Sequence, residues 1–139
     1  MLNFNAPVIN YQLVQITSNQ VLTRYYFPDL PNLRDVKTYK ITAFHRSLIE
    51  KDLNNVNLIG QSDFENSYMT IYANGFEYIQ KLGLSALQTI SKENNFKNMN
   101  GGLCLQPLTI DFSKSYVEIA PSITPSFPAS FVFGIYYAK

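Results

Sequence analysis

The sequence predicts an all-β protein built as a β-sandwich, and three observations support this prediction. Short runs rich in β-branched and aromatic residues follow one another along the chain, and clusters of Gly, Pro, Asn, Asp and Ser separate them. The 139 residues include 10 Tyr and 10 Phe, which are good strand formers. Only one short segment carries a helix-capping pattern, so the sequence predicts very little helix. About eight strands divided by turns at this spacing are typical of a sandwich or a barrel.

The N-terminal third of the chain is predicted to contain three strands and a proline-containing loop. The first strand is expected over residues 11–17. Residues 20–27 carry bulky side chains at both alternating sets of positions, so we expect a strand that is covered on both faces. Pro28 and Pro31 cannot donate to a strand ladder, and they favour an ordered corner of the sandwich. Residues 38–45 alternate in polarity and are predicted to form a half-exposed strand.

A β-hairpin is the clearest local signal in the middle of the chain. Residues 67–73 and 76–82 are both strand-like runs. Asn74 and Gly75 lie between them, and both tolerate the positive φ angles that a type I′ turn requires. We therefore predict that the two runs pair through a tight turn.

Less regular segments flank this hairpin. Residues 55–59 are predicted to form a short strand, and residues 61–66 a polar loop. After the hairpin, Ser85 and Gln88 have the spacing of a capping box. This pattern predicts one short helix or helical turn over residues 85–92.

The C-terminal part of the chain is predicted to contain further strands. Residues 103–112 form the first of them, and Pro107 requires either an edge position or a bulge. A turn at residues 111–114 leads into a strand over residues 115–120. Residues 129–137 are a long apolar run and are predicted to form the last strand.

The connections between these strands favour one wiring of the sandwich. They include one tight hairpin and several long loops, as in Greek-key or jelly-roll proteins and unlike an up-and-down barrel. An immunoglobulin-like fold is disfavoured, because the chain has 1 Cys and no Trp and so lacks the Cys, Trp, Cys signature. We predict one domain over residues 1–139, a single jelly-roll β-sandwich of about eight strands with one short helix.

Charge and composition disfavour several classes of function. The 11 basic and 10 acidic residues are mixed along the chain and give a net charge of +1, so we expect no specific binding of nucleic acid. The N-terminal residues lack the features of a signal peptide, and no apolar run is long enough for a transmembrane segment. Cys104 is the only cysteine, which excludes an internal disulfide. Between Leu103 and Leu105 it is expected to be a small buried side chain, in a protein made in a reducing cytosol.

Motifs for catalysis or cofactor binding are absent from the sequence. His45 is the only histidine, and at the end of a predicted strand it is expected to be structural or solvated. Asp63 and Glu65 share a loop and have a spacing that could suit calcium, but the EF-hand pattern is missing and a solvated loop is expected. No serine-hydrolase elbow, P-loop or dinucleotide-binding motif occurs. The sequence therefore predicts a protein that is not an enzyme, with no cofactor and no metal site.

Three segments carry a resemblance to a known group of proteins. They are YYFPDLPNLRDVKTYKITAF at residues 25–44, NGFEYIQKLGLSAL at residues 74–87 and IDFSKSYVEI at residues 110–119. This pattern resembles small jelly-roll structural proteins of bacteriophages, among them capsid and vertex components of icosahedral phages. The resemblance implies a virion protein that is synthesised in the host cytoplasm and located in the capsid. It also implies assembly with copies of itself, with a vertex pentamer favoured, and contact with other capsid proteins.

Aromatic side chains are the candidates for such contacts, because assembling surfaces are rich in Tyr and apolar residues and poor in long charged side chains. The interface candidates are Tyr25, Tyr26, Phe27, Phe96, Met99, Tyr136 and Tyr137. Phe96 and Met99 are candidates for loop contacts, since they lie in a polar stretch that is predicted to be a surface loop. For each candidate, burial in the chain's own core is the competing interpretation.

A carbohydrate-binding or receptor-binding module on the same fold is the alternative function. Sugar recognition uses exposed aromatic rings together with Asn, Asp or Gln. Clustering of Tyr with Asn and Asp in one concave loop region would favour this alternative, whereas aromatic residues along the flanks of the sandwich would favour assembly. Binding of single-stranded nucleic acid on an aromatic sheet is disfavoured by the near-neutral charge.

Overall fold

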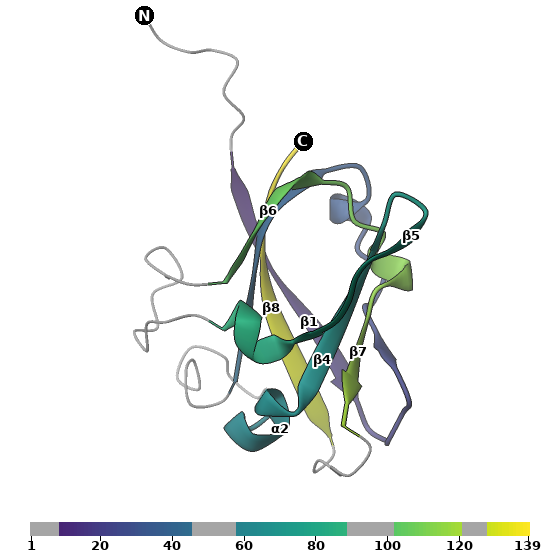
Figure 1. Cartoon of the computed structure of the whole chain (residues 1–139), viewed down its shortest axis with the longest axis vertical. Helices are drawn as coiled ribbons and strands as arrows, with labels where there is room; N and C mark the ends of the chain where they lie inside the picture. The colour runs from purple at the N-terminus through teal and green to yellow at the C-terminus, as the bar shows by residue number, and fades with distance from the viewer. Residues whose placement is uncertain (1–8, 46–57, 89–101, 121–127) are drawn as a thin grey trace, which may run out of the picture.

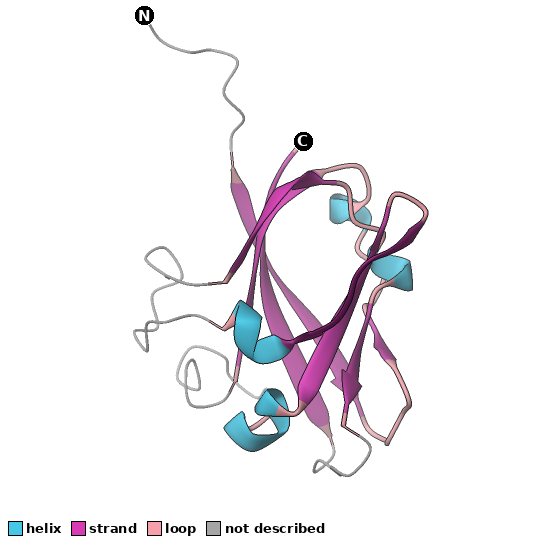
Figure 2. Ribbon diagram, in the orientation of Figure 1, coloured by secondary structure: helices cyan, strands magenta, loops and turns pink. Residues whose placement is uncertain are grey.

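The protein is a sandwich of two antiparallel β-sheets, seen in a computed structural model that describes residues 9–45, 58–88, 102–120 and 128–139 (Figures 1 and 2). The strand bounds are β1 Asn10–Ser18, β2 Tyr25–Tyr26, β3 Lys37–Phe44, β4 Ser67–Ala73, β5 Phe76–Gly83, β6 Leu103–Leu108, β7 Tyr116–Ile119 and β8 Ala129–Ala138. The helical segments are the α-helix α2 Gln61–Glu65 and the 3₁₀ turns η1 Pro31–Leu33, η2 Leu84–Leu87 and η4 Phe112–Lys114. The all-β prediction is confirmed.

The two sheets are formed by nested pairs of strands. One sheet has the order β1-β8-β3-β6 and the other has the order β2-β7-β4-β5. The first strand pairs with the last, β2 with β7, β3 with β6, and β4 with β5, all antiparallel. Lateral pairs between β3 and β8 and between β4 and β7 complete each sheet. The chain therefore crosses repeatedly between the sheets, as the long predicted connections required.

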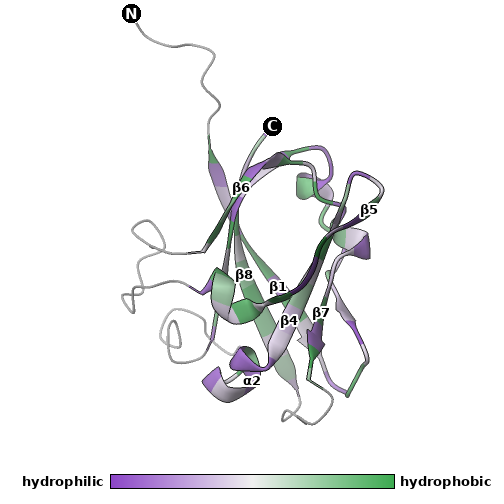
Figure 3. Ribbon diagram, viewed as in Figure 1, coloured by the Kyte–Doolittle hydropathy of each residue, from purple (hydrophilic) through white to green (hydrophobic). Residues whose placement is uncertain are grey.

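The core lies between the facing sheets. The ring centroids of Tyr25 and Phe131 are 5.4 Å apart, and those of Phe27 and Phe133 are also 5.4 Å apart. Phe131, Phe133 and Ile135 alternate along β8 and are all buried, and Figure 3 shows that β8 is largely hydrophobic. Burial of a side chain of this size contributes about 1.5–3 kcal/mol relative to exposure. The central strand β8 is thus the main apolar wall of the core.

Several local predictions are confirmed. β4 and β5 are joined at Asn74 and Gly75, whose φ angles are 57° and 85°, as a type I′ turn requires. The predicted strands over residues 11–17, 115–120 and 129–137 correspond to β1, β7 and β8. Pro107 lies in β6, which is an edge strand of its sheet in the described part of the chain. On an edge strand, one side of the backbone has no neighbouring strand. Proline, which has no N–H to donate, is therefore tolerated at this position without loss of a ladder hydrogen bond.

The predicted strand over residues 20–27 is wrong except for the two residues of β2. The segment before β2 is held by side chains, because Ser18 Oγ accepts from Gln20 N–H at 3.2 Å and Tyr25 Oη accepts from Leu22 N–H at 3.1 Å. These local bonds replace ladder bonds. Val21 is 64% exposed and Leu22 is 41% exposed, so the expected covering on both faces is also wrong.

The strand predicted over residues 38–45 is confirmed as β3, but its expected half-exposure is wrong, because β3 is an interior strand with Thr38 and Thr42 buried. Its register shifts between Thr38 and Lys40 against both neighbouring strands. An alternating pattern of polar and apolar residues does not predict such an irregularity. The ring of Tyr11 covers Thr42 by lying across Gly134: a Cβ at residue 134 would be 2.5 Å from both Tyr11 Oη and Thr42 Oγ1. A polar residue that faces outward is therefore buried.

The helical segment predicted over residues 85–92 is found in part, as the 3₁₀ turn η2 at Leu84–Leu87. The polar loop predicted over residues 61–66 is wrong, because α2 forms there, with Phe64 buried in the core and a hydrogen bond from Gln61 to Glu65 at 3.0 Å. At the predicted site, η2 is a single 3₁₀ turn whose N-cap is Gly83, and Gln88 is already extended. Ser85 lies inside this turn and caps nothing. Residues 89–92 of the expected helix lie outside the described residues.

Two further strand predictions need correction. The strand predicted over residues 103–112 ends at Leu108, because the chain then crosses to the other sheet, where Ile110 forms a bridge with Ala73. Cys104 was expected to be buried but is exposed on edge strand β6. Of the strand expected over residues 55–59, Leu58 forms an isolated bridge with Ser130, and residues 55–57 lie outside the described residues. None of the helices in the described ranges is long and apolar enough to cross a membrane.

Candidate interaction surfaces

A belt of aromatic and charged side chains crosses the outer face of the β2-β7-β4-β5 sheet. Tyr26 and Tyr116 are opposite each other in register, and their ring centroids are 5.5 Å apart. Arg24 lies over the Tyr116 ring, with its Cζ atom 4.2 Å from the centroid, and the Tyr116 hydroxyl donates to Glu77 on β5 at 3.5 Å. We call Arg24, Tyr26, Glu77 and Tyr116 the tyrosine belt. Its outermost ring, Tyr26, is 47% exposed and can contact a partner.

Two exposed aromatic side chains lie on β5, at the edge of the same sheet. Phe76 is 54% exposed and Tyr78 is 44% exposed, and their ring centroids are 6.0 Å apart. β5 has β4 on one side and no neighbour on the other among the described strands. We call Phe76 and Tyr78 the edge patch. It joins an apolar surface to a strand edge that can accept further pairing.

The outer face of the β1-β8-β3-β6 sheet carries a more enclosed pair of tyrosines. The ring centroids of Tyr11 and Tyr136 are 4.7 Å apart, and Lys40 Nζ lies 5.4 Å from the Tyr136 centroid. Burial raises the pKa of the Tyr11 hydroxyl well above its ordinary value, and the neighbouring Tyr136 raises it further. Burial also raises the pKa of Tyr136. These two residues, which we call the tyrosine pair, are engaged mainly with their own chain.

A pocket of about 610 Å³ lies beside the turn of the β4–β5 hairpin. Figure 1 shows that this turn is at one end of the sandwich. Three loop segments form its walls: residues 28–34, residues 72–75 and residues 109–114. Leu33, Ile110 and Phe112 line it and are buried core residues. We call this cavity the loop pocket. It has apolar walls at its base and polar residues at its rim.

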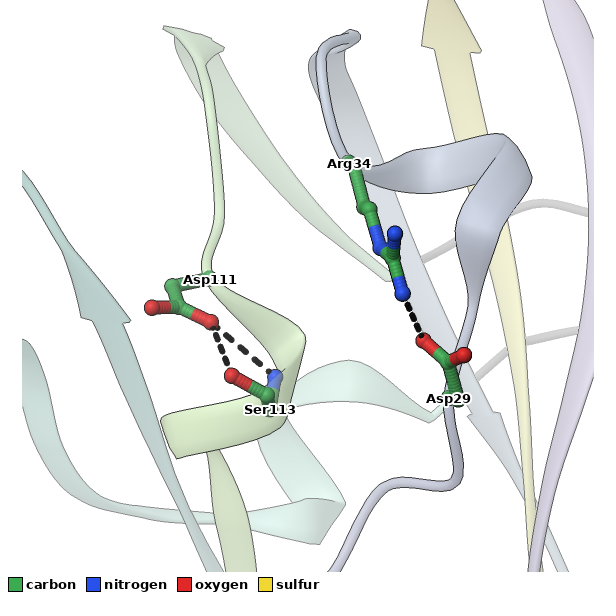
Figure 4. Close-up of polar contacts among 4 residues, drawn as sticks. All are labelled: Asp29, Arg34, Asp111 and Ser113. Atoms are coloured by element: carbon green, nitrogen blue, oxygen red, sulfur yellow. Dashed lines mark hydrogen bonds and ion pairs between the residues drawn. The ribbon is translucent and has the colours of Figure 1, made fainter.

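The polar groups of the loop pocket are held by short hydrogen bonds on separate wall segments (Figure 4). Arg34 Nη2 donates to Asp29 Oδ1 at 2.7 Å. Asp111 Oδ1 accepts from the N–H of Ser113 at 3.1 Å and from its hydroxyl at 2.5 Å. This carboxylate therefore caps the η4 turn and is fixed in direction.

Tyr72 lines the loop pocket together with Phe112, and both its hydroxyl and its ring already have partners within the protein. Its hydroxyl donates to the carbonyl oxygen of Gly75 at 2.8 Å. Lys114 Nζ lies over its ring, 4.9 Å from the centroid. The pocket thus brings Tyr72, Asn74 and two aspartates together in one loop region, but the Tyr72 ring already has a cation on one face.

The predicted interface residues have different positions in the structure. Tyr25 is 2% exposed and Phe27 is 6% exposed, so their assignment to an interface is wrong, and their rings pack in the chain's own core because they face the inner side of the sandwich. Tyr26, between them, faces outward. Tyr136 belongs to the tyrosine pair, and Tyr137 is half-buried against the core. The remaining two candidates, Phe96 and Met99, lie outside the described residues.

Sequence reasoning missed three exposed aromatic residues on the described strands, Tyr68, Phe76 and Tyr78. A usable signal was present for the last two. Phe76 and Tyr78 come shortly after the Asn74-Gly75 turn, with the polar residue Glu77 between them. Such alternation is typical of an antiparallel strand that has one face in contact with solvent. The identity of β5 as a sheet edge depends on long-range pairing, which local sequence does not reveal.

The titratable residues singled out in the sequence do not form a metal site among the described residues, where no group of three or more His, Cys, Asp or Glu side chains is placed to hold an ion. His45 is 2% exposed, and its ring centroid is 5.0 Å from that of Phe64. It is therefore a core residue. Asp63 and Glu65 both lie on α2, where Glu65 accepts a hydrogen bond from Gln61.

Comparison of this chain with protein-family models, with curated proteins and with solved structures finds no match.

Proposed function

We propose that this chain is a jelly-roll structural protein of a bacteriophage virion, a capsid vertex or minor capsid subunit. On this proposal it is not an enzyme, and it acts by symmetric self-assembly and by contact with other capsid proteins. It is synthesised in the host cytoplasm and resides in the capsid. A vertex pentamer is the favoured assembly.

The nested strand pairing supports the jelly-roll part of this proposal. Pairing of first with last, second with second-last, and so on, is the pattern produced when one long antiparallel ribbon folds over into two sheets. Jelly rolls combine eight strands and two Greek keys, and viral capsid domains are among them. The orders β1-β8-β3-β6 and β2-β7-β4-β5 are compatible with this wiring.

The edge patch is the observation that carries the assembly proposal. Exposed edge strands of stable monomers are commonly protected by charge, proline or short length. β5 is eight residues long and carries Glu77, Lys81 and two register shifts. However, it also presents Phe76 and Tyr78 side by side on a strand that has no second neighbour among the described strands. Aromatic residues are enriched at the centres of protein interfaces, and their burial contributes substantially to association. We infer that this edge contacts a neighbouring subunit.

A carbohydrate-binding or receptor-binding role is compatible with assembly, because the loop pocket and the edge patch are formed by different side chains. The pocket gathers Tyr72 with Asn74, Asp29 and Asp111. The exposed aromatic rings, in contrast, lie on the strands, which favours assembly as the main role.

Light scattering of the untagged protein across a concentration series tests the assembly proposal. We expect a discrete closed oligomer for the wild type, with the mass of a pentamer favoured. Replacing both edge-patch residues, Phe76→Ser and Tyr78→Ser, is expected to shift the protein to monomer, because the apolar contact is lost while the exposed positions cost little stability.

The matched control is the double replacement Val21→Ser and Leu22→Ser, which removes two exposed apolar side chains elsewhere on the surface. This control is expected to keep the oligomer. A wild-type monomer at every concentration would overturn autonomous ring assembly. An oligomer that survives in the edge-patch variant would show that another surface holds the subunits together.

A further inference from the structure

We propose that the loop pocket binds a neutral, hydroxyl-rich ligand, a saccharide unit, through its two aspartates and Arg34. This activity is additional to assembly and does not depend on it.

The size and base of the pocket suit such a ligand. Its volume of about 610 Å³ falls within the range of small-molecule sites, about 300–1,000 Å³. Leu33, Ile110 and Phe112 provide an apolar base that is fixed, because all three belong to the hydrophobic core. Sugar rings have apolar C–H faces as well as hydroxyl groups, so an apolar base with a polar rim matches both parts.

The rim offers acceptors at defined positions. Asp29 and Asp111 each use Oδ1 for a hydrogen bond within the protein, which leaves Oδ2 of each carboxylate to accept from a ligand hydroxyl. Hydrogen bonds to an ionised acceptor are shorter and stronger than those between neutral groups. Because Asp111 is held by Ser113, its free oxygen needs little reorganisation to bind.

The rim also offers donors. Arg34 uses one of its N–H groups for Asp29, and a guanidinium has five in a planar fork. The exposed Asn74 on the hairpin turn provides a side-chain amide on the facing wall. Hydroxyl groups both donate and accept, so a polyol can satisfy carboxylates and donors at the same time.

The balance of charge selects a neutral ligand. Asp29 and Asp111 contribute two negative charges, and Arg34 and Lys114 contribute two positive charges, so the rim has no net charge. A phosphate site would require an excess of donors and positive charge, and a site for a polycation would require an excess of carboxylates. Lys114 is moreover placed over the Tyr72 ring rather than free for an anion.

A glycan array of neutral and acidic oligosaccharides, followed by NMR titration with the strongest neutral binder, tests this proposal. We expect binding to at least one neutral glycan, with amide shifts concentrated in residues 28–34, 72–75 and 109–114. Asp29→Asn is expected to weaken binding by about tenfold or more, because it replaces a charged acceptor. The exposed Asp29–Arg34 pair contributes little to stability, so this variant should fold normally.

The matched control is Asp35→Asn, which makes the same change of charge at an exposed residue close to the same loop but outside the pocket lining. It should bind as the wild type does. Absence of binding to all neutral glycans, binding confined to acidic glycans, or shifts away from the three wall segments would each overturn the proposal. So would equal affinity of wild type and Asp29→Asn. None of these outcomes depends on the oligomeric state, which the light-scattering experiment measures separately.

Discussion

The outer faces of the two sheets use the same residue type in opposite ways. On the β1-β8-β3-β6 sheet, Tyr11 crosses Gly134 and packs against Tyr136, and burial raises the pKa of both hydroxyls. On the β2-β7-β4-β5 sheet, Tyr26 keeps 47% of its surface exposed beside Tyr116. The tyrosine pair is thus enclosed by its own chain, while Tyr26 retains aromatic surface for contacts with other molecules.

Gly134 accounts for the enclosure of the tyrosine pair. A Cβ atom at this position would lie 2.5 Å from Tyr11 Oη and 2.5 Å from Thr42 Oγ1, so glycine alone leaves room for the ring to cross β8. Tyr11 and Tyr26 each have a tyrosine directly opposite them, Tyr136 and Tyr116. However, the residue two positions before Tyr136 on β8 is Gly134, whereas β7 contains no glycine beside Tyr116. The difference between the faces thus depends on the glycine of the adjacent strand.

Gly134→Ala should displace Tyr11 from its position across β8. Of the changes considered, we expect it to lower the free energy of unfolding the most. The new methyl group must displace Tyr11 or Thr42, and overpacking of this kind costs about 1–3 kcal/mol. Urea denaturation measures the loss in free energy of unfolding. Gly83→Ala is the control, because a Cβ there meets nothing within 4 Å and φ is −58°. Equal stability of the two variants would show that the packing of the tyrosine pair does not depend on the missing side chain at Gly134.

The second largest effect is expected at alkaline pH, where ionisation of the tyrosine pair should lower the stability of the folded protein. The raised pKa of Tyr11 means that the folded protein holds this proton more tightly than the unfolded chain. The resulting stability is fully present below the unfolded pKa of about 10 and is lost as pH rises toward the folded value. Denaturation curves at several pH values above 10 would measure this loss.

Tyr11→Phe is expected to reduce the alkaline loss of stability, since phenylalanine has no proton to release. Tyr26→Phe, on the exposed face, retains Tyr11 and should retain the Tyr11-dependent loss. If both variants showed the wild-type pH dependence, the loss would have to come from other groups.

Tyr26→Ser should have the smallest effect on the isolated subunit. Much of the Tyr26 ring is exposed, and surface substitutions usually change stability by less than about 0.5 kcal/mol. Thermal denaturation under conditions that keep the protein monomeric would measure it. A loss above about 1 kcal/mol would mean that the tyrosine belt supports the fold itself rather than being available to a partner.

Local chemistry in the sequence was sufficient to predict some elements and insufficient for others. The Asn74-Gly75 turn and the alternating residues around it predicted the β4–β5 hairpin, because both signals are local. The alternation in residues 20–27 predicted a strand, but bonds from Ser18 and Tyr25 side chains hold most of that segment outside the sheet. The alternation of polar and apolar residues does not show that side chains compete with a neighbouring strand for these backbone N–H groups.

The candidate surfaces were predictable to a smaller extent. Composition indicated that some tyrosines would be exposed, but Tyr25, Tyr26 and Phe27 are consecutive and only the middle one faces outward. The loop pocket combines three segments that are far apart in the chain, and its volume depends on how the sheets pair. Long-range pairing determines both which face of a strand is covered and which loops meet.

The nested strand order also constrains when the chain can fold. The β4–β5 hairpin closes a short loop, whereas pairing of β1 with β8 places Asn10 opposite Tyr137 and brings Gln15 into a side-chain hydrogen bond with Ser130, 115 positions later. Distant pairings carry a larger entropic cost and make folding slow. β8 occupies an interior position between β1 and β3, yet it is the last of the described strands to leave the ribosome. During synthesis the β1-β8-β3-β6 sheet therefore stays open until β8 emerges, and the earlier strands depend on chaperones or on their own solubility until then.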